Sequence, residues 1–462
     1  MIHYFCLEDK CFRIADTDRA FVFLTRNIPK KCTKFCAIYQ KTVTINAKTW
    51  QNKLHVFTYK TLFANIINIS EVFHMKIAIM GFGTVGSGAY ENAKNAGGIE
   101  VVRILARHSR EGYEHLNDII TPDIDDIAGD PEIELVVESM GGIEPAREYV
   151  LKCLRAGKHV VTPNKNLISA CYSELMEAAE ANGVKLRFTS AVGGGIPWLF
   201  NLLRTKRCDE ILQVRGIVNG TCNYILDAMY DKGADFGEML KIAQEIGYAE
   251  ADPSADIEGT DTLRKTVIST NLAFDTAIQE EDVLCYGIDT IQACDVAYLK
   301  EKGLACKLMM RAEKKNGAVE VYVEPTAFAA DSLEANVKLN NNLITLTAKH
   351  IGPQSFYGQG AGMMPTGESV IQDVIDIRDG REQNIGIKDA SELKADNSNA
   401  VHRYYIRHDR MCEHMEPLVD TYEEKDGIYY CISKPIPVEK MHEMGHHRKE
   451  KGKEMFFAAL AD

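Results

Sequence analysis

A six-residue run that begins at position 81 constrains the fold of this chain more than any other part of the sequence. Gly81-Phe82-Gly83-Thr84-Val85-Gly86 follows an apolar stretch from Lys76 to Met80, and a helical pattern runs from about Val85 to Asn95. In this context the first glycine permits a tight turn, the second lets a pyrophosphate approach, and the third allows close packing of helix on strand. The free amides of the helix start also favour an anion. We therefore expect a dinucleotide at Gly81, Gly83, Thr84, Val85 and Gly86.

Alternating strands and helices continue after this turn. The pattern predicts strands at Ile99–Ala106, Glu134–Glu138 and His159–Thr162, and a helix at Pro145–Ala156. This spacing is typical of a Rossmann-type, doubly wound parallel sheet. Beyond about Cys208 the pattern is mixed, with strands predicted at Val214–Val218, Ala318–Tyr322 and Leu343–Thr347 and helices from Tyr224 to Ala273. We predict an α/β protein with a second, α+β domain for substrate binding and dimerisation, and a small C-terminal α+β tail.

These patterns divide the chain into five parts. We assign residues 75–207 to the dinucleotide-binding domain and residues 208–350 to the catalytic domain. The glycine-rich stretch around Gly360 and the helical pattern after it predict that residues 351–386 return to the cofactor, with Gly360 beside it. We interpret residues 387–462 as a linker and tail, with strands at Arg403–Arg407, Ile428–Ile432 and Phe456–Leu460 and a helix between the first two.

Residues 1–74 differ in composition from the rest of the chain. They contain none of the 34 glycines, and they carry eleven Lys or Arg against five Asp or Glu, whereas the whole chain has a net charge of −13. A folded domain of this length without glycine would lack residues for tight turns. Because the strand before the glycine motif begins directly after Met75, we expect residues 1–74 to be a non-native or disordered N-terminal extension.

The acidic charge and the cysteines narrow the class of protein. A net charge of −13 gives no general attraction for nucleic acid or anionic membranes. No apolar run reaches the roughly 18 residues of a membrane helix. The 13 cysteines have no repeated spacing, so we interpret them as reduced thiols of a cytoplasmic enzyme.

The choice of dinucleotide depends on the end of the second predicted strand. An NAD site usually carries an acid there, which binds the ribose hydroxyl. This chain has Arg107-His108-Ser109-Arg110 instead. A guanidinium at Arg107 would pair with the 2′-phosphate of NADP. The alternative is that Arg107 and Arg110 are solvated loop charges, and NAD stays open as the cofactor.

Two further groups of residues are candidates for catalysis. Lys165 follows Pro163-Asn164 just past a predicted parallel strand, where α/β sheets bind ligands. Lys165 could equally be an ordinary surface lysine. The stretch from Glu250 to Lys265 holds five acids and a lysine. If a helix begins near Asp256 or Gly259, Asp261 and Lys265 form an i,i+4 pair on one face. Such pairs are usually solvated, but an apolar run follows, and a buried lysine beside carboxylates can transfer protons.

At these motifs the sequence resembles the homoserine dehydrogenase family, from Met75 to about Ile377. The resemblance is carried by Gly81 to Gly86, Thr162-Pro163-Asn164-Lys165, Asn219 to Leu226, Gly247 to Lys265, and Gly360 to Thr366. It implies interconversion of L-homoserine and L-aspartate 4-semialdehyde, in the biosynthesis of threonine, methionine and isoleucine. We also expect a homo-oligomer, a dimer or tetramer.

The resemblance also implies roles for single residues. Lys265 corresponds to the lysine that transfers the proton, Asp261 to the acid that positions it, and Lys165 to a lysine near substrate and nicotinamide. Glu250 and Asp256 correspond to acids that bind homoserine. The carbonyls of Val192, Gly194 and Ile196 correspond to ligands of a structural sodium ion, although many members carry a glutamate where this chain has Thr189. Residues 400–462 resemble a degenerate regulatory ACT domain without its usual glycine loop.

Two other functions compete with this one. Aspartate semialdehyde dehydrogenase shares the scaffold, but it needs a cysteine nucleophile paired with a histidine, for which Cys222 and Cys171 are the candidates. A dinucleotide-sensing regulator without catalysis would account for the glycine motif and the tail. It would not account for the residues from Glu250 to Lys265.

Overall fold

The computed structural model describes residues 2–7, 10–17, 20–24, 74–381, 392–411, 413, 415–453 and 455–461. The chain forms two compact units, Met1–Glu71 and Val72–Asp462. The first contains an antiparallel sheet of β1 (Ile2–Leu7), β2 (Lys10–Thr17) and β3 (Ala20–Leu24). Most of residues 1–74 lies outside the described residues, so our expectation for this segment stays a prediction.

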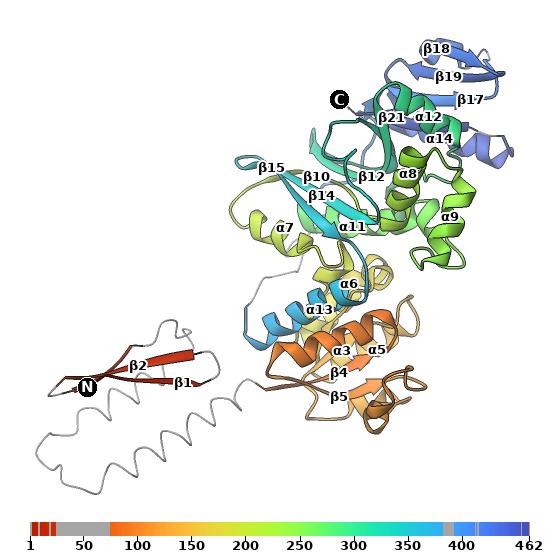
Figure 1. Ribbon diagram of the computed structural model, residues 1–462. Coiled ribbons are helices and arrows are strands. Elements are labelled where there is room, and N and C mark those ends of the chain that lie inside the picture. The colour runs from red at the N-terminus through yellow and green to blue at the C-terminus, as the bar shows by residue number, and fades with distance from the viewer. Residues whose placement is uncertain are drawn as a thin grey trace, which may run out of the picture. The chain divides into compact units, whose positions relative to one another are not determined.

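A six-stranded parallel sheet forms the first domain of the second unit (Figure 1). Its strands lie in the order β6 (Ile120–Thr121), β5 (Ile99–Leu105), β4 (Met75–Met80), β7 (Leu135–Glu138), β8 (His159–Val161) and β9 (Leu186–Arg187). Its helices are α3 (Thr84–Ala96), η2 (Glu114–Ile119), α4 (Asp125–Ala128), α5 (Ala146–Arg155), α6 (Lys165–Ala181) and α13 (Met363–Arg378). The buried strand residues are mainly Val, Ile and Leu, as a sheet covered on both faces requires. The Rossmann-type fold predicted from the sequence is confirmed.

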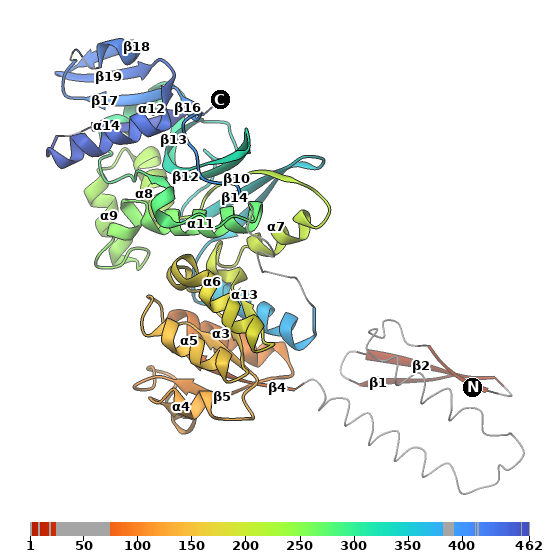
Figure 2. The ribbon, with the colours of Figure 1, turned by 180° about the vertical axis from the view of Figure 1, so that it is seen from behind.

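Helix α13 packs against α3, although more than 260 residues separate the two in sequence. Figures 1 and 2 show the two helices side by side in both views. Glycine makes the close approach possible: a Cβ on Gly88 would lie 1.9 Å from the carbonyl oxygen of Met363, and one on Gly367 would lie 2.4 Å from Gly88. The chain therefore returns from the second domain to the helix that follows the glycine turn.

The second domain is built on a mixed sheet. Its strands lie in the order β15 (Gly352–Gln359), β14 (Asn341–Ala348), β10 (Ile211–Ile217), β12 (Leu304–Lys315) and β13 (Ala318–Ala329), with β11 (Leu284–Cys285) beside β13. Its helices and short turns are η3 (Thr189–Ala191), α7 (Trp198–Lys206), α8 (Gly220–Lys232), α9 (Phe236–Glu245), α10 (Ser254–Ile257), α11 (Thr260–Phe274), η4 (Glu280–Asp282) and α12 (Ala293–Glu301). Helix α11 is buried along most of its length, so it forms the core of this domain.

The tail continues this same sheet. Strand β21 (Met455–Leu460) lies between β13 and β17 (Tyr404–His408), and β19 (Ile428–Ser433) and β18 (Val419–Lys425) follow. The remaining elements are β16 (Val401–His402), η5 (Glu416–Leu418), β20 (Ile436–Pro437) and α14 (Val438–Glu450). Our prediction of a helix between the first two tail strands is wrong. That segment contains β18, which turns into β19 at Asp426-Gly427, where both residues have positive φ, and the helix α14 comes after β19.

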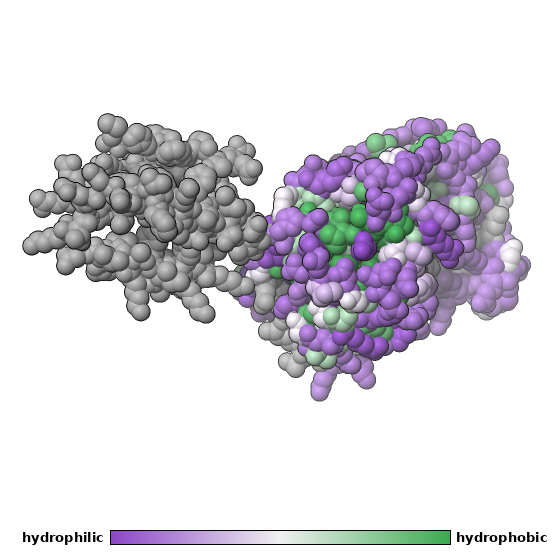
Figure 3. Space-filling model, turned by 90° about the horizontal axis from the view of Figure 1, so that it is seen from below, coloured by the Kyte–Doolittle hydropathy of each residue, from purple (hydrophilic) through white to green (hydrophobic). Residues whose placement is uncertain are grey.

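The surface has two general features. On the face seen from below, polar side chains surround one gathering of apolar ones (Figure 3). Among the residues that the structure describes, no helix combines the length and the apolar character that a bilayer span requires.

Candidate active site

The glycine turn between β4 and α3 leaves room for a ligand at one of its three glycines. Gly81 has φ +87°, and a Cβ on Gly86 would lie 2.1 Å from the carbonyl oxygen of Gly81, so packing within the protein fixes both. A Cβ on Gly83 would meet nothing within 4 Å. Helix α3 begins at Thr84 without a side-chain cap, so its first amides stay available. This geometry suits a phosphate beside Gly83.

Arg107 and Arg110 differ in their surroundings. Arg107 follows β5 and is exposed. Arg110 is half-buried, and its Nη1 donates to the hydroxyl of Ser87 at 2.9 Å. Because Ser87 lies in the first turns of α3, the guanidinium of Arg110 is held beside the glycine turn.

A buried acid, Glu138, connects the ends of neighbouring strands by hydrogen bonds. The sequence analysis did not single it out. Glu138, the last residue of β7, has no exposed surface. Its carboxylate accepts from the hydroxyl of Thr162 at 2.5 Å and from the amide of Met140 at 2.7 Å. Burial raises the pKa of Glu138 above its ordinary value, and these hydrogen bonds oppose the rise. Its place at the end of a buried strand was visible in the sequence and could have identified it.

Lys165 is the first residue of α6, and this start is well defined. Asn164 caps the helix, since its side-chain oxygen accepts from the amide of Leu167 at 3.2 Å and its Nδ2 donates to the carbonyl of Gly142 at 2.7 Å. The Nζ of Lys165 lies 3.0 Å from Oδ1 of Asp261 on α11. The negative charge of Asp261 raises the pKa of Lys165. The two domains therefore meet at this ion pair.

Asp261 and Lys265 form the predicted pair on one face of α11. The Nζ of Lys265 donates to Oδ2 of Asp261 at 2.7 Å and to the carbonyl of Val218 at 2.6 Å. The two residues are 7% and 8% exposed, so the pair is buried rather than solvated. Burial would raise the pKa of Asp261, but Lys265 and Lys165 outweigh it and hold this pKa below its usual range.

Asn219 connects this pair to a second acid. It caps α8, with its side-chain oxygen accepting from the amide of Cys222 at 2.8 Å. Its Nδ2 donates to Oδ2 of Asp261 at 2.9 Å and to Oδ1 of Asp256 at 2.6 Å. Burial raises the pKa of Asp256. Sequence reasoning gave Asn219 no role, although its position before a helix was a capping signal.

The remaining predicted residues lie outside this cluster. Glu250 is exposed, and among the described residues no hydrogen bond or ion pair joins its carboxylate to the lysines. Gly194 has φ +53°, and its Cα lies against Gly360, because a Cβ there would be 2.4 Å from the carbonyl oxygen of Gly360. The carbonyl of Ile196 accepts from the amide of Trp198 at 2.7 Å. The loop of Val192, Gly194 and Ile196 is thus beside the return segment.

Comparisons with known proteins agree with this geometry. A family model described as the NAD binding domain of homoserine dehydrogenase matches residues 81–189, and one described as homoserine dehydrogenase matches residues 197–375. A homoserine dehydrogenase from Synechocystis is 41% identical over 317 residues, which cover 66% of this chain and 73% of the relative. One from Corynebacterium glutamicum is 42% identical over 316 residues, covering 65% and 71%. The chain belongs to the homoserine dehydrogenase family.

Solved homoserine dehydrogenases share the fold. The enzyme from Thiobacillus denitrificans matches with a TM-score of 0.75 at 30% identity, covering 84% of this chain and 98% of that one. The enzyme from S. aureus matches with a TM-score of 0.66 at 28% identity, covering 84% and 99%. The resemblance found in the sequence is therefore confirmed. The activity is that of a homoserine dehydrogenase, an oxidoreductase of amino-acid biosynthesis that interconverts L-homoserine and L-aspartate 4-semialdehyde.

Cys222 lies in α8, and its surroundings are not those of a nucleophile. It is fully buried, and its thiol donates to the carbonyl of Asp256 at 3.1 Å. Burial raises its pKa far above the ordinary value, so the thiolate is suppressed. Burial also raises the pKa of Cys171. Neither cysteine has the setting of the competing thioester mechanism.

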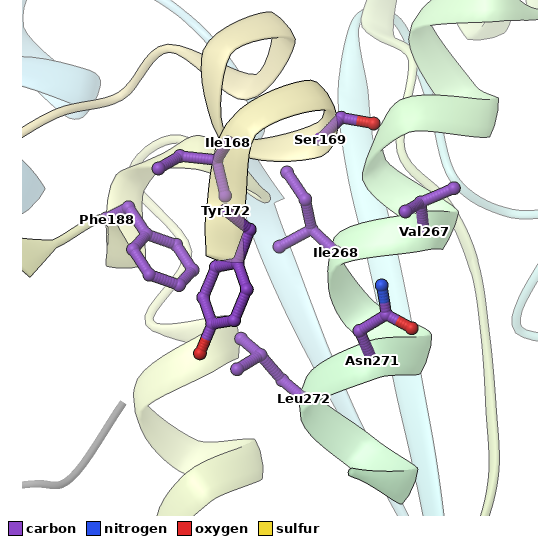
Figure 4. Close-up of a pocket in the computed structure, with 8 residues that line it drawn as sticks. All are labelled: Ile168, Ser169, Tyr172, Phe188, Val267, Ile268, Asn271 and Leu272. Carbon is purple, nitrogen blue, oxygen red and sulfur yellow. The ribbon is translucent and has the colours of Figure 1, made fainter. Parts of the chain in front are cut away.

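A small apolar pocket lies between α6 and α11, farther along the helix pair that carries Lys165 and Asp261 (Figure 4). Its lining is mostly hydrophobic: Ile168, Ser169, Tyr172, Phe188, Val267, Ile268, Asn271 and Leu272. The polar groups at its edge are already engaged, since Ser169 donates to Glu280 and Asn271 donates to the carbonyl of Ile278. The pocket is a packing gap of the helix pair and not the substrate site.

Proposed function

We propose that this homoserine dehydrogenase uses Lys265 as its proton-transfer group, with Asp261 and Lys165 beside it. One observation carries the proposal: the buried ammonium of Lys265 has three donors, and two of them are held by Asp261 and the carbonyl of Val218. The third is left for a substrate oxygen. Because its position is fixed on α11, Lys265 needs no rearrangement to act.

The proton moves at Nζ of Lys265. In the direction of oxidation, the uncharged amine takes the hydroxyl proton of homoserine, and in the reverse direction the ammonium returns it to the aldehyde oxygen. A bound nicotinamide would supply the hydride acceptor, or in reverse the donor, for the carbon that bears this oxygen. Asp261 stays ionised because two lysines hold its pKa low. Lys165 stays cationic beside it and would attract the substrate oxygen as negative charge develops there.

Two acids, Asp256 and Glu250, are candidates for binding the ammonium end of homoserine. Asp256 shares Asn219 with Asp261, which puts its carboxylate next to the reacting groups. We propose that Asp256 and Glu250 bind the ammonium of homoserine. Glu250 is exposed and has no partner of its own among the described residues, so its carboxylate stays available for a ligand.

For the cofactor we propose NADP, with NAD as the alternative. The glycine turn at Gly81, Gly83 and Gly86 suits the pyrophosphate of either one, with Thr84, Val85 and Gly360 near it. Arg110, held beside α3 by Ser87, and the exposed Arg107 supply positive charge for a 2′-phosphate. A hyperthermophilic archaeal homoserine dehydrogenase in complex with NADPH shares the fold, at 23% identity and a TM-score of 0.58.

We propose a sodium ion at the loop of Val192, Gly194 and Ile196, although the carbonyl of Ile196 also accepts from the amide of Trp198. Backbone carbonyls are suitable ligands for a hard cation, and the buried hydroxyl of Ser190 in the same loop has no hydrogen-bond partner in the structure. Thr189 brings no carboxylate to this loop, and the nearby Asp373 already accepts from the amide of Thr189 at 2.9 Å. We therefore propose a site of backbone carbonyls and the Ser190 hydroxyl, without a carboxylate, that stabilises the loop against Gly360.

We also propose a homo-oligomer, a dimer or tetramer, located in the cytoplasm. Strand β15 is an edge of the large sheet, and Tyr357 on it is 57% exposed. An exposed edge of this kind is a usual place for association. In the part of the chain whose side chains the structure describes, eight cysteines are free thiols, which suits a reducing compartment. Light scattering of the purified protein measures the oligomeric state.

The experiment that tests the catalytic proposal is Lys265→Ala, followed by nicotinamide absorbance with homoserine. We expect turnover to fall by about 10²–10⁴-fold while fluorescence shows unchanged dinucleotide binding. Lys307→Met is the matched control, because Lys307 is another buried lysine, bonded to Asn223 and to the carbonyl of Val337. It should lose stability and keep its turnover per folded molecule. Activity of Lys265→Ala close to that of the parent would exclude the assignment.

A further inference from the structure

Residues 284–289, which we call the strap, lie between the C-terminal helix and the start of α11. The strap begins with β11, which pairs in parallel with β13, and the amide of Tyr286 donates to the carbonyl of Val323 at 2.8 Å. Tyr286 is 2% exposed. The strap is thus anchored on the central sheet, and it touches a different element on each side.

On one side the strap supports the turn at residues 257–259. The amide of Ile288 donates to the carbonyl of Ile257 at 2.7 Å. A Cβ on Gly287 would lie 2.1 Å from that same carbonyl oxygen, and a Cβ on Gly259 would lie 2.8 Å from the sulfur of Cys285. The two backbones are therefore in direct contact, and neither can shift without the other.

The supported turn carries the substrate site. Gly259 has φ +94° and is the N-cap of α11, and Asp261 lies two residues further on. Asp256 lies just before the turn. Both carboxylates bond the same amide group of Asn219, at 2.9 and 2.6 Å. A displacement of the turn would therefore change the spacing of the two acids, which Asn219 holds together.

On its other side the strap packs against the tail. The ring of Tyr286 stacks on Phe457 of β21 with centroids 4.3 Å apart, and its hydroxyl donates to the carbonyl of Met455 at 3.3 Å. A Cβ on Gly445 of α14 would lie 2.7 Å from both rings, so the helix leaves no space there. The imidazole of His446 is 3.0 Å from the carbonyl oxygen of Cys285.

Charged groups join the same elements at the surface. The ammonium of Lys449 on α14 lies 2.6 Å from Asp289 of the strap and 3.9 Å from Glu258 of the turn. These side chains are partly exposed, so each pair adds little stability by itself. They show that α14 reaches past the strap to the turn.

We propose that α14 positions the substrate site through the strap, and that Gly445 and Tyr286 are positioning residues for homoserine binding. The tail would then set the affinity for homoserine without touching it. This inference rests on the proposed assignment of Asp256 and Asp261 to the site. The contacts described for the strap involve the catalytic domain and the tail and not the glycine turn, so we expect dinucleotide binding to change little.

The test is Gly445→Ala, with His447→Ala as a control on the same helix, since His447 is exposed and has no hydrogen bond or ion pair among the described residues. The added methyl pushes on Tyr286. We expect the KM for homoserine to rise by about threefold or more, as for other residues that couple two sites. The dinucleotide Kd, measured by fluorescence, should stay near that of the parent, and the turnover number is measured beside it because the turn also carries Asp261. His447→Ala should match the parent in all three.

A second variant keeps the test informative if Gly445→Ala folds poorly. His446→Ala removes the contact with Cys285 and adds no atom, so it should also raise this KM, by a smaller factor. If both single variants melt earlier but keep the parental KM, the tail has only a structural role and the proposal is overturned.

Asp256→Asn separates this inference from the site assignment. If it leaves the KM for homoserine unchanged, the assignment of Asp256 is wrong, whatever the tail does. If it raises the KM while Gly445→Ala and His446→Ala do not, only the inference about α14 fails. Because coupling is reciprocal, homoserine added with the dinucleotide should slow hydrogen exchange in α14 and in the strap, and unchanged exchange there would contradict the proposal.

Discussion

The dinucleotide domain and the tail are both built of strands and helices, but they differ in where their contacts come from. In the dinucleotide domain the central strands β5, β4, β7 and β8 are joined by short helical connections and form one parallel sheet. In the tail, β21 lies between β17 and β13, and β13 belongs to the catalytic domain. The first region completes its own sheet, whereas the second extends a sheet that another domain began.

A buried ion pair also joins the tail to the catalytic domain. Asp295 of α12 and Arg407 of β17 are 0% and 3% exposed, and the Nε of Arg407 donates to Asp295 at 2.9 Å. The hydroxyl of Tyr405 donates to the same carboxylate at 2.7 Å. The tail and the catalytic domain therefore share a core, and similar secondary structure does not make the tail a separate domain.

The largest expected effect is that of Arg407→Ala. It leaves Asp295 buried without its cation, which typically costs about 3–5 kcal/mol. Thermal unfolding should show the tail and the catalytic domain melting together at a lower temperature. Asp295→Leu/Arg407→Met, which removes both charges, should recover most of the loss. A separate early transition that leaves the catalytic domain untouched would mean that the tail folds independently, and the comparison above would fail.

Two glycine variants test the dinucleotide domain, whose sheet, among the described strands, takes none from another domain. Gly86→Ala puts a methyl 2.1 Å from the carbonyl oxygen of Gly81 and should destabilise the domain by about 1–3 kcal/mol. Gly83→Ala meets no protein atom within 4 Å, so its stability should change by less than about 0.5 kcal/mol, while its dinucleotide Kd rises. Urea titration and fluorescence measure the two quantities. Equal effects of the two variants on stability would contradict the open site at Gly83.

The arginines after β5 allow a finer test of the same region. Arg107→Asp and Arg110→Asp should lower the ratio of kcat/KM for NADP to that for NAD by roughly tenfold or more, because a hydrogen bond to a charged group contributes about 1.5–3 kcal/mol. The acid would repel the 2′-phosphate and could accept from the ribose hydroxyl. Whichever variant moves the ratio identifies the arginine that recognises the phosphate. If neither does, the preference for NADP is wrong.

The smallest effect is expected from a chain that starts at Met75. Strand β4 begins at that residue and lies between β5 and β7, so both of its edges are paired without residues 1–74. We expect the same activity as the full chain and a Tm within a few degrees. Protection of residues 1–74 from protease in the full chain, or a larger drop in Tm, would show that they are a structural element.

The features that could be predicted from sequence are those that depend on residues close together in the chain. The glycine motif, the strand ends and the pair of Asp261 and Lys265 depend on local spacing, and the sequence predicted the Rossmann-type sheet and the helical pair correctly. Asn219 was missed because its role is to join two acids that lie 37 and 42 residues away. Such a contact exists only after α8 and α11 pack.

The hairpins were missed for a different reason. Asn316-Gly317 and Asp426-Gly427 are dipeptides typical of two-residue hairpin turns, and both residues of each pair have positive φ. They join β12 to β13 and β18 to β19. The signal was present, but we interpreted the stretch between the first two tail strands as a helical pattern. The link between β21 and β13, in contrast, has no local signal.

The place of β21 also has a consequence for how the protein is made. The ribosome delivers β13 long before β21, and the catalytic domain can collapse around α11 in the meantime. Until Met455–Leu460 emerges, β17 has one unpaired edge, and Thr326 and Ala327 of β13 lack their partners on β21. Among the described strands of this sheet, β21 is synthesised after all the others, and it pairs with both β13 and β17. We therefore expect a chain cut just before Met455 to keep the catalytic core but to aggregate more readily than the full chain.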